Sequence, residues 1–380
     1  MSGTPLVVLA GGGTGGHLFP LLAVAGALRS AVGDVRFVLF GTGRAIDRSV
    51  VAGSGLELVA QSVRPLHITK PWTFPGFLAA WIRACRTCRV RLEADRPAIV
   101  LGSGGFASGP PVFEARRAGI PTALINPDAI PGRANRFLAS RVDVVFAQWE
   151  ESASCFPGHP GFKVTGCPIR AEFQRATRET GIARFGLDNR RRTLLITGAS
   201  QGARTINDAV VAILDDLAAV GAWQVLHITG SADLDGVRRA YAARNVPGTV
   251  LAFTEHMPDA LAAADLVLSR AGASSLAEIT AVGRPAILMP YPHHRDRHQD
   301  ANAAVLVGRG AAIIVTDTRN CQETAASLRR ELLHLLRDRP ALTRMAEAAR
   351  SLGRPDAAGA IAAELVGLSR GMLTTNTPAS

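Results

Sequence analysis

The chain has 380 residues, of which 47% are hydrophobic and 19% are charged. This length is enough for two or three domains, and the composition excludes a peptide, a disulfide-stabilised miniprotein and a disordered chain. Forty-two Lys and Arg residues against 31 Asp and Glu leave a net charge of +11. This charge predicts an anionic partner, which could be nucleic acid, a phosphorylated small molecule or acidic lipid.

The cysteines and the N-terminal segment indicate a reducing compartment and no leader. Five cysteines in a chain of this length do not predict a disulfide framework. We interpret the C-x-x-C motif of Cys85 and Cys88 as structural, because no second pair follows at zinc-ribbon spacing. No charged residue precedes Arg29, but the start is not basic and glycines between positions 11 and 16 interrupt the apolar run, unlike a signal peptide. No uninterrupted run of about 20 apolar residues occurs, so we expect only peripheral membrane contact.

Short β-branched runs alternate with longer amphipathic runs along the whole chain. The first half predicts strands at 5–10, 35–40, 98–101, 122–125 and 143–147, with a helix at 18–30. The second half predicts strands at 193–197, 224–228, 249–252, 266–268, 286–289 and 312–315, with helices at 206–219 and 275–282. This alternation is typical of the α/β class, and its repetition predicts two Rossmann-like, doubly wound domains.

We expect the N-terminal domain at 1–168 and the C-terminal domain at 169–347, joined near Gly166 to Arg170. A C-terminal helix at 348–368 is expected to return to the N-terminal domain, and the tail at 369–380 is expected to be disordered. Ligands of doubly wound folds bind at the carboxyl ends of the strands, so two such halves predict a cleft that both line.

The first glycine-rich loop, 11–17, lies directly between a predicted strand and a predicted helix and ends on His17. Glycines there let backbone N–H groups approach a phosphate at a helix N-terminus. No Lys follows, which disfavours a nucleoside triphosphatase, and no acidic residue ends the second strand, which disfavours a dinucleotide site. The helix dipole favours a neutral imidazole at His17, which could act as a base; the alternative is that His17 only hydrogen-bonds the loop.

Three further glycine loops follow predicted strands, at 102–110, 198–203 and 270–278. Any one of these loops could be an ordinary glycine-containing turn. Two loops in each half, all at strand-to-helix junctions, favour two anionic ligands that meet in the cleft.

These loops together resemble the MurG family. The motifs that carry the resemblance are Gly12-Gly13-Thr14-Gly15-Gly16-His17-x-x-Pro20, Gly104-Gly105-Phe106-x-Ser108-Gly109-Pro110, Ser200-Gln201-Gly202-Ala203-Arg204-x-x-Asn207 and the segment 253–302. The similarity runs from about Val7 to Ile314. It implies an inverting GT-B N-acetylglucosaminyltransferase of peptidoglycan synthesis, which moves GlcNAc from UDP-GlcNAc to the MurNAc C4 hydroxyl of lipid I. It further implies a peripheral protein on the cytoplasmic side of the inner membrane, with no cofactor, no metal and no nucleic acid partner.

The resemblance implies a role for particular residues, with His17 as the catalytic base. The implied donor-binding residues are Thr14, Gly15, Gly16, Asp128, Arg170, Ser200, Thr254, Ala273, Ser274, Ser275, Leu276, Ala277, Glu278 and Gln299. The implied acceptor diphosphate-binding residues are Gly13, Gly104, Gly105 and Ser108. Glu278 matches a carboxylate that holds the ribose hydroxyls, although Ser275 to Glu278 also reads as a helix capping box.

Three positions depart from the family pattern. Asn126-Pro127-Asp128 stands where Glu-Gln-Asn is usual, Cys167 replaces an Asn, and Asp47 stands where Glu is common. Asp128 therefore places a charge where a neutral amide is expected, and an altered sugar or acceptor preference stays open.

Two other clusters need an interpretation. His294 and His298 are four residues apart, but Arg295 and Arg297 would repel a cation, so we interpret this loop as basic rather than metal-binding. Trp72 and Phe74 lie in a proline-broken loop beside basic residues and predict contact with an anionic membrane surface, with Phe77 on the following helix.

Two alternative functions remain open at this stage. One is another GT-B nucleotide-sugar enzyme, either a glycolipid synthase or a UDP-GlcNAc epimerase. The other is a non-catalytic basic protein that binds RNA or acidic lipid, which would explain the charge but not the four glycine loops.

Overall fold

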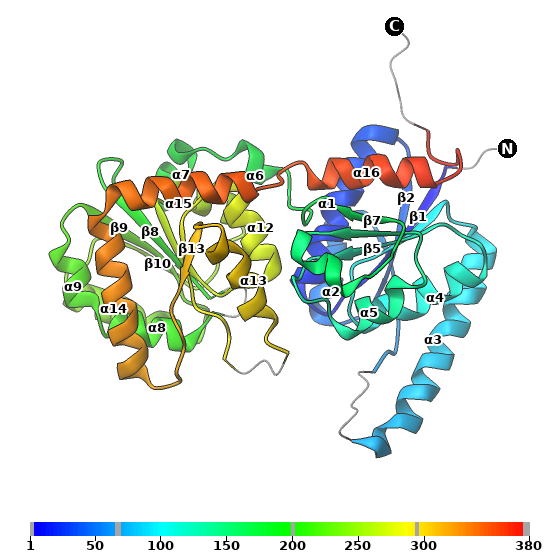
Figure 1. The fold of residues 1–380 in the computed structure, drawn as a ribbon, viewed down its shortest axis with the longest axis horizontal. Helices are drawn as coiled ribbons and strands as arrows, with labels where there is room; N and C mark the ends of the chain where they lie inside the picture. Colours follow the sequence, from blue (N-terminus) through cyan, green and yellow to red (C-terminus); the bar gives the residue numbers. More distant parts are fainter. Residues whose placement is uncertain (1–3, 65–69, 199–201, 293–295, 375–380) are drawn as a thin grey trace, which may run out of the picture. The chain divides into compact units, whose positions relative to one another are not determined.

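The computed structural model describes residues 4–64, 70–198, 202–292 and 296–374 and divides into two compact units (Figure 1). The first unit contains Met1–Arg170 and Asp356–Ser380, and the second contains Ala171–Pro355. Arg170, which we assigned to the C-terminal domain from the sequence, is thus the last residue of the first unit's longer segment.

A parallel sheet with strand order β3-β2-β1-β4-β5-β6-β7 forms the centre of the first unit. Its strands are β1 (Leu6–Ala10), β2 (Arg36–Gly41), β3 (Glu57–Ala60), β4 (Ile99–Gly102), β5 (Thr122–Asn126), β6 (Val144–Ala147) and β7 (Phe162–Val164). Val8 on β1 pairs with Val38 on one side and with Val100 on the other. The inner strands are buried on both faces, which is why they read as continuous apolar runs.

Helices cover both faces of this sheet (Figure 1). They are α1 (Gly15–Val32), α2 (Ala45–Ala52), α3 (Phe74–Asp95), α4 (Gly109–Arg117), α5 (Arg133–Ala139) and α16 (Ala357–Leu368), with 3-10 turns η1 (Pro71–Thr73), η2 (Phe106–Ser108) and η3 (Glu150–Cys155). Helices α1 and α16 share one core with the sheet, through Leu21, Leu28 and Ile361. Helices α3 and α4 share the other, through Cys88, Leu92 and Val112.

The second unit repeats this plan with strand order β10-β9-β8-β11-β12-β13. Its strands are β8 (Arg192–Thr197), β9 (Trp223–Ile228), β10 (Gly248–Leu251), β11 (Leu266–Ser269), β12 (Ala286–Leu288) and β13 (Ala312–Ile314). Its helices are α6 (Glu172–Arg175), α7 (Arg178–Phe185), α8 (Arg204–Val211), α9 (Leu214–Ala219), α10 (Leu234–Ala243), α11 (Met257–Ala263), α12 (Ala273–Val282), α13 (His298–Gly308), α14 (Cys321–Arg337) and α15 (Arg339–Leu352). Every recorded strand pair in both sheets is parallel. The predicted α/β class with two doubly wound domains is confirmed.

Several element boundaries differ from those expected from the sequence. The helix predicted at 206–219 is divided into α8 and α9, and the segment 348–368 contains the end of α15, a break and then α16. Leu373, in the segment expected as a disordered tail, is buried in the first unit's core. Phe74, expected in a loop, is the first residue of α3.

In each unit the strand order reverses between two adjacent strands. Strand β1 pairs with β4 in the first unit, and β8 pairs with β11 in the second. Such a switch point is where open α/β sheets bind ligands, outside the carboxyl ends of the strands. The four glycine loops of the sequence follow these four strands, two at each switch point.

Candidate active site

His17 lies in the first turn of α1, at the switch point of the first sheet. The side chain is half-buried, and its Nδ1 lies 3.2 Å from the Thr14 hydroxyl. Burial lowers the pKa of His17 below its ordinary value of 6.5, against the opposing effects of the Asp128 carboxylate and a hydrogen bond with the Gly12 backbone. The imidazole is therefore neutral at pH 7, which is the form that can accept a proton.

Asp47, at the start of α2, holds the first glycine loop in place. Its carboxylate is fully buried and accepts hydrogen bonds from the Gly13 amide at 2.7 Å and from both the amide and the hydroxyl of Thr42. A Cβ on Gly12 would lie 2.8 Å from the same carboxylate. The Gly13 N–H, predicted to meet a diphosphate, is thus donated to Asp47 in this structure.

The second glycine loop packs between His17 and Asn135. A Cβ on Gly105 would lie 3.1 Å from the His17 ring, and one on Gly104 would lie 2.6 Å from Asn135 Oδ1. Ser108, predicted to bind diphosphate, is fully buried, and its hydroxyl lies 2.6 Å from the carbonyl oxygens of Ala10 and Gly104. The Ser108 side chain therefore ties the second glycine loop to the end of β1.

Asp128 and Arg170 both belong to the first unit. Asp128 follows β5 and is half-buried, and its backbone carbonyl accepts a hydrogen bond from Asn126 Nδ2 at 2.8 Å. The Arg170 guanidinium lies 5.8 Å from the centre of the Phe19 ring, on the same helix as His17. Thr14, Gly15 and Gly16 lead into that helix, and Thr14 and Gly16 are exposed. All of these predicted donor-binding residues thus belong to the unit that carries His17.

In the second unit, α12 begins directly after the loop that follows β11. Its N-cap is Gly272, and no side-chain capping bond is present, so the capping box considered for Ser275 and Glu278 is not formed. Ala273, Ser274 and Ser275 are half-buried in the first turn, where backbone N–H groups have no partner within a helix. Glu278 is half-buried one turn further along.

Leu276 and Ala277 are buried in α12, unlike the residues before them. The Leu276 amide donates to the Gly272 carbonyl at 3.0 Å. The Leu276 N–H is thus used within the helix, and the donor contact implied for Leu276 and Ala277 stays a prediction.

Helix α13 supports the turn before α12. The side-chain oxygen of Gln299 accepts hydrogen bonds from the amides of Ala271, at 3.2 Å, and Tyr291, at 2.9 Å, and buried Asn302 donates to the Ala271 carbonyl. Thr254 lies between β10 and α11, where its hydroxyl accepts from the His256 amide. Ser200, predicted to contact the donor diphosphate, lies outside the described residues.

A buried ion pair beside this turn was missed by the sequence reasoning. Arg270 Nη1 lies 3.0 Å from Asp317 Oδ2, and the Thr205 hydroxyl contacts both side chains. Burial alone would raise the pKa of Asp317, but hydrogen bonds from Thr205, Arg319 and Arg270 leave it below its ordinary value. The pair joins the loop before α12, the start of α8 and the loop after β13. Arg270 directly after a buried strand was the available signal, since a charge there requires a partner.

Aromatic side chains extend from the first turn of α3 toward α4 and α5. Successive ring centres are 6.4 Å apart for Phe74 and Phe77, 6.2 Å for Phe77 and Trp81, and 6.2 Å for Trp81 and Phe137. Trp72 is 73% exposed and Phe74 is 50% exposed. Figure 1 shows the beginning of α3 projecting away from the rest of the first unit.

Two motifs considered from the sequence for metal binding remain, the C-x-x-C pair and the histidine loop. Cys85 and Cys88 are buried, and burial together with the nearby Glu114 carboxylate raises the pKa of the Cys85 thiol to about 12. Within the ranges that the structure describes, no three His, Cys, Asp or Glu side chains gather where they could hold a metal ion. His294 lies outside these ranges, and His298 Nε2 lies 3.4 Å from Asp296.

One helix among the described residues, α1, has the length and hydropathy that crossing a membrane requires. Its side chains Leu18, Leu21 and Leu28 are fully buried in the core of the first unit.

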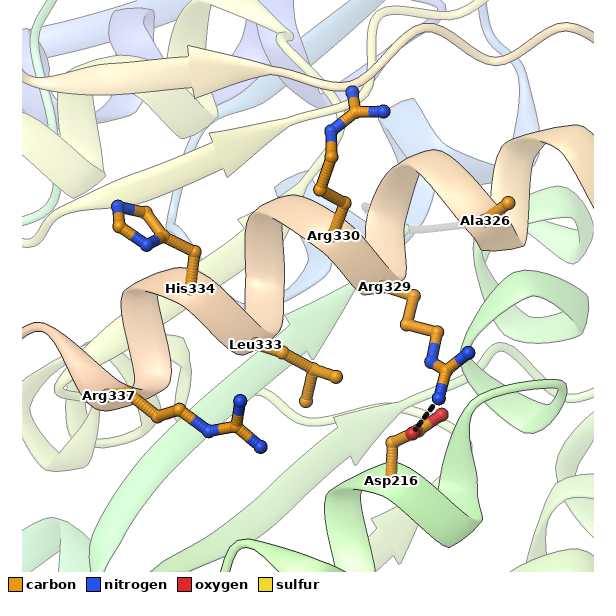
Figure 2. A pocket seen from close by; sticks show the side chains of 7 residues that line it. All are labelled: Asp216, Ala326, Arg329, Arg330, Leu333, His334 and Arg337. Carbon is orange, nitrogen blue, oxygen red and sulfur yellow. Dashed lines mark hydrogen bonds and ion pairs between the residues drawn. The ribbon is translucent and has the colours of Figure 1, made fainter.

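A basic hollow of about 650 Å³ lies on α14 and α9 of the second unit (Figure 2). Arg329, Arg330, His334 and Arg337 line it, and Arg329 forms an ion pair with Asp216 at 2.6 Å. None of the predicted site residues lines this hollow.

Comparison with known sequence families agrees with this architecture. The glycosyltransferase family 28 N-terminal domain matches residues 7–147, and the glycosyltransferase family 28 C-terminal domain matches residues 193–361. Two doubly wound units with a family 28 domain on each define a GT-B glycosyltransferase.

Curated relatives define the particular family. The chain is 37% identical to the UDP-N-acetylglucosamine--N-acetylmuramyl-(pentapeptide) pyrophosphoryl-undecaprenol N-acetylglucosamine transferase of Moorella thermoacetica, over 93% of this chain and 96% of the relative. It is 35% identical to the enzyme of the same name from Desulforamulus reducens, over 92% of this chain and 95% of the relative. The chain belongs to this family of N-acetylglucosamine transferases, the MurG family.

Solved structures share the fold. The crystal structure of Acinetobacter baumannii MurG matches with a TM-score of 0.75 and 24% identity, covering 96% of this chain and 99% of that one. UDP-GlcNAc 2-epimerase from Neisseria meningitidis, solved with UDP-GlcNAc bound, matches with a TM-score of 0.67 and 14% identity, covering 95% of this chain and 100% of that one.

Proposed function

We propose that this protein transfers GlcNAc from UDP-GlcNAc to the MurNAc C4 hydroxyl of undecaprenyl-diphosphate-MurNAc-pentapeptide, with inversion at the sugar carbon. The observation that carries the proposal is the pair of glycine loops at the switch point of each unit, because backbone N–H groups at helix starts are suited to diphosphates. The names of the curated relatives supply the donor and the acceptor.

The second unit binds the donor in this proposal. The first-turn amides of α12, at Ala273, Ser274 and Ser275, face the UDP moiety, and Glu278 holds the ribose hydroxyls. Thr254 lies near the uracil, Gln299 near the sugar and Ser200 near the diphosphate. Since the Gln299 oxygen already accepts two amides, its NH₂ group is the one left to donate to the sugar.

The first unit binds the lipid-linked acceptor through Gly104 and Gly105. His17 takes the proton from the acceptor hydroxyl as that oxygen attacks the sugar in a single displacement, and the bond to UDP breaks in the same step. The half-buried, neutral imidazole supports this role. Arg170 and the helix-start amides stabilise the negative charge on the departing UDP.

The aromatic start of α3 docks on the membrane that carries the acceptor. Trp72, Phe74 and Phe77 enter the interface between lipid headgroups and chains, and the exposed Arg83 and Arg86 on the same helix favour an anionic surface. The proposed donor, UDP-GlcNAc, is a cytoplasmic metabolite, so the protein acts as a peripheral protein on the cytoplasmic side of the inner membrane. In this proposal its net positive charge attracts anionic lipid rather than nucleic acid.

The test is whether UDP release depends on the acceptor. Purified protein receives UDP-GlcNAc or UDP-glucose, with and without a lipid I analogue, and both released UDP and the lipid product are quantified. We expect UDP and disaccharide lipid in equal amounts, only with acceptor, and with UDP-GlcNAc preferred. UDP released at the same rate without acceptor favours an epimerase, and binding of RNA without affinity for UDP favours the non-catalytic alternative.

A further inference from the structure

Three polar side chains are buried beneath the start of α8 in the second unit. Asn207 lies on α8, His227 on β9 and Tyr241 on α10, and their exposed fractions are 1%, 0% and 5%. Three separate elements thus each direct a polar group to one point in the core, although apolar residues form most of that core. Such groups need mutual hydrogen bonds to be tolerated there.

These side chains form one continuous hydrogen-bonded chain. His227 Nδ1 lies 3.1 Å from the Tyr241 hydroxyl, and His227 Nε2 lies 3.1 Å from Asn207 Oδ1. Asn207 Nδ2 donates to the Thr229 carbonyl at 2.9 Å and to Asp233 Oδ2 at 2.7 Å.

The acceptors at one end fix the direction of every hydrogen bond in this chain. Asp233 and the Thr229 carbonyl can only accept, so the Asn207 amide turns its NH₂ toward them and its oxygen toward His227. His227 Nε2 must then carry a proton, which leaves Nδ1 to accept from the Tyr241 hydroxyl. Asp233 and the Thr229 carbonyl thereby select the orientation of Asn207 and the Nε2-protonated tautomer of His227, and the Tyr241 hydroxyl completes the network by donating to Nδ1.

Asn207 connects this network to the third glycine loop. The Thr229 carbonyl that accepts from Asn207 lies 2.2 Å from the position of a Cβ on Gly202, whose φ is +74°. The Gly202 backbone therefore packs against the Thr229 carbonyl oxygen, which accepts the hydrogen bond from Asn207. Arg204, two residues further on, begins α8.

We propose that Tyr241 and His227 are positioning residues for donor binding, which hold Asn207 and the Thr229 carbonyl so that the Gly202 backbone keeps the position that donor binding requires. This inference rests on the proposed function, because the loop's role in binding UDP comes from there. His227 and Tyr241 are themselves neutral, since burial lowers the pKa of His227 to about 3 and raises the pKa of Tyr241 above its usual range.

The test compares Tyr241→Phe with wild type in the full chain. This change removes one hydroxyl and keeps the ring, and it leaves the buried Nδ1 of His227 without its donor. We expect UDP to bind roughly tenfold more weakly by calorimetry, because a buried acceptor loses its partner. The KM for UDP-GlcNAc should rise by the same factor, with kcat and the KM for the acceptor within about twofold of wild type. Nitrogen NMR should show His227 as the Nε2-protonated tautomer in both proteins, with the Nδ1 signal shifted in the variant by loss of the hydrogen bond from Tyr241.

Trp223→Phe is the matched control. Trp223 lies on β9 with His227, is buried in the same core, and donates its Nε1–H to the Leu336 carbonyl at 3.0 Å, away from the glycine loop. Trp223→Phe should lower the Tm about as much as Tyr241→Phe does and leave the affinity for UDP unchanged. The proposal is overturned if both variants lower the Tm alike and Tyr241→Phe binds UDP as wild type does, or if both weaken UDP binding equally. Failure of the wild-type chain to bind UDP would instead overturn the proposed function, and the donor role of the network with it.

Discussion

Gly105 lies directly against the imidazole ring of His17. A Cβ on Gly105 would stand 3.1 Å from Cε1 and 3.2 Å from Nδ1 of that ring, and the φ of Gly105 is +73°, a conformation that other residues rarely adopt. The second glycine loop therefore fixes where the proposed base lies, in addition to any contact that it makes with the acceptor.

Replacing Gly105 by Ala should displace His17 and lower kcat by about 100-fold, because small displacements of a catalytic group have effects of that size. Steady-state transfer kinetics measure the effect. Gly119→Ala is the control, since Gly119 has a φ of +69° and nothing within 4 Å of an added Cβ. Both variants should lose similar stability from backbone strain. Equal kcat values for the two variants would contradict the role of this contact.

The pH dependence of the transfer reaction should show how the groups around His17 shift its pKa. Burial lowers the pKa of His17, so the neutral base persists below pH 6.5, and the acid limb of kcat/KM should lie below that value. Asp128 opposes this effect, so Asp128→Asn should move the acid limb to still lower pH and reduce kcat, because the imidazolium formed in the reaction loses a stabilising charge. An acid limb at the same pH in wild type and variant would show that Asp128 does not act on His17.

The ion pair of Arg270 and Asp317 should matter for stability. Asp317→Ala leaves a buried guanidinium without its partner and should lower the free energy of unfolding by about 3–5 kcal/mol in urea titrations. Since the pKa of Asp317 is below its ordinary value in the folded state, its contribution is complete above about pH 4 and is lost as the pH falls through the folded-state pKa. Asp215→Ala, which breaks the exposed Arg244 pair, is the control and should cost less than about 1 kcal/mol.

Membrane contact should depend on the first turn of α3. Trp72→Ser and Phe74→Ser together should weaken binding to anionic vesicles in a flotation assay, because two exposed aromatic side chains are lost from the interface. Val90→Ser is the control, since Val90 is 62% exposed but lies near the other end of the same helix. Vesicle binding that falls equally in both variants would argue against docking through this turn.

The fold class could be predicted from the sequence because the central strands of both sheets are buried on both faces. Strands such as β1 and β4 appear as unbroken apolar runs, and glycines mark the loops that follow β1, β4, β8 and β11. Strands β3 and β7 were missed because they lie at the edges of the first sheet and are only partly buried, which leaves no apolar run to find.

Contacts between distant residues could not be read from the sequence. Asp47 reaches Gly13 across 34 positions, and Arg270 reaches Asp317 across 47. The capping interpretation at Ser275 failed for a related reason: local spacing allowed it, but the helix begins two residues earlier, at Ala273. Residue type and spacing predicted which loops carry the site, whereas the side chains that hold those loops required the structure.

The central claim is that this chain forms a GlcNAc–MurNAc bond with His17 as the base, and single-turnover transfer of labelled GlcNAc to a lipid I analogue tests it most directly. Wild type should yield one labelled disaccharide lipid for each UDP released, whereas His17→Ala should bind UDP normally and transfer at least about 100-fold more slowly. Near-wild-type transfer by a folded His17→Ala variant would contradict the assignment of the base, and no labelled lipid from wild type would contradict the proposed reaction itself.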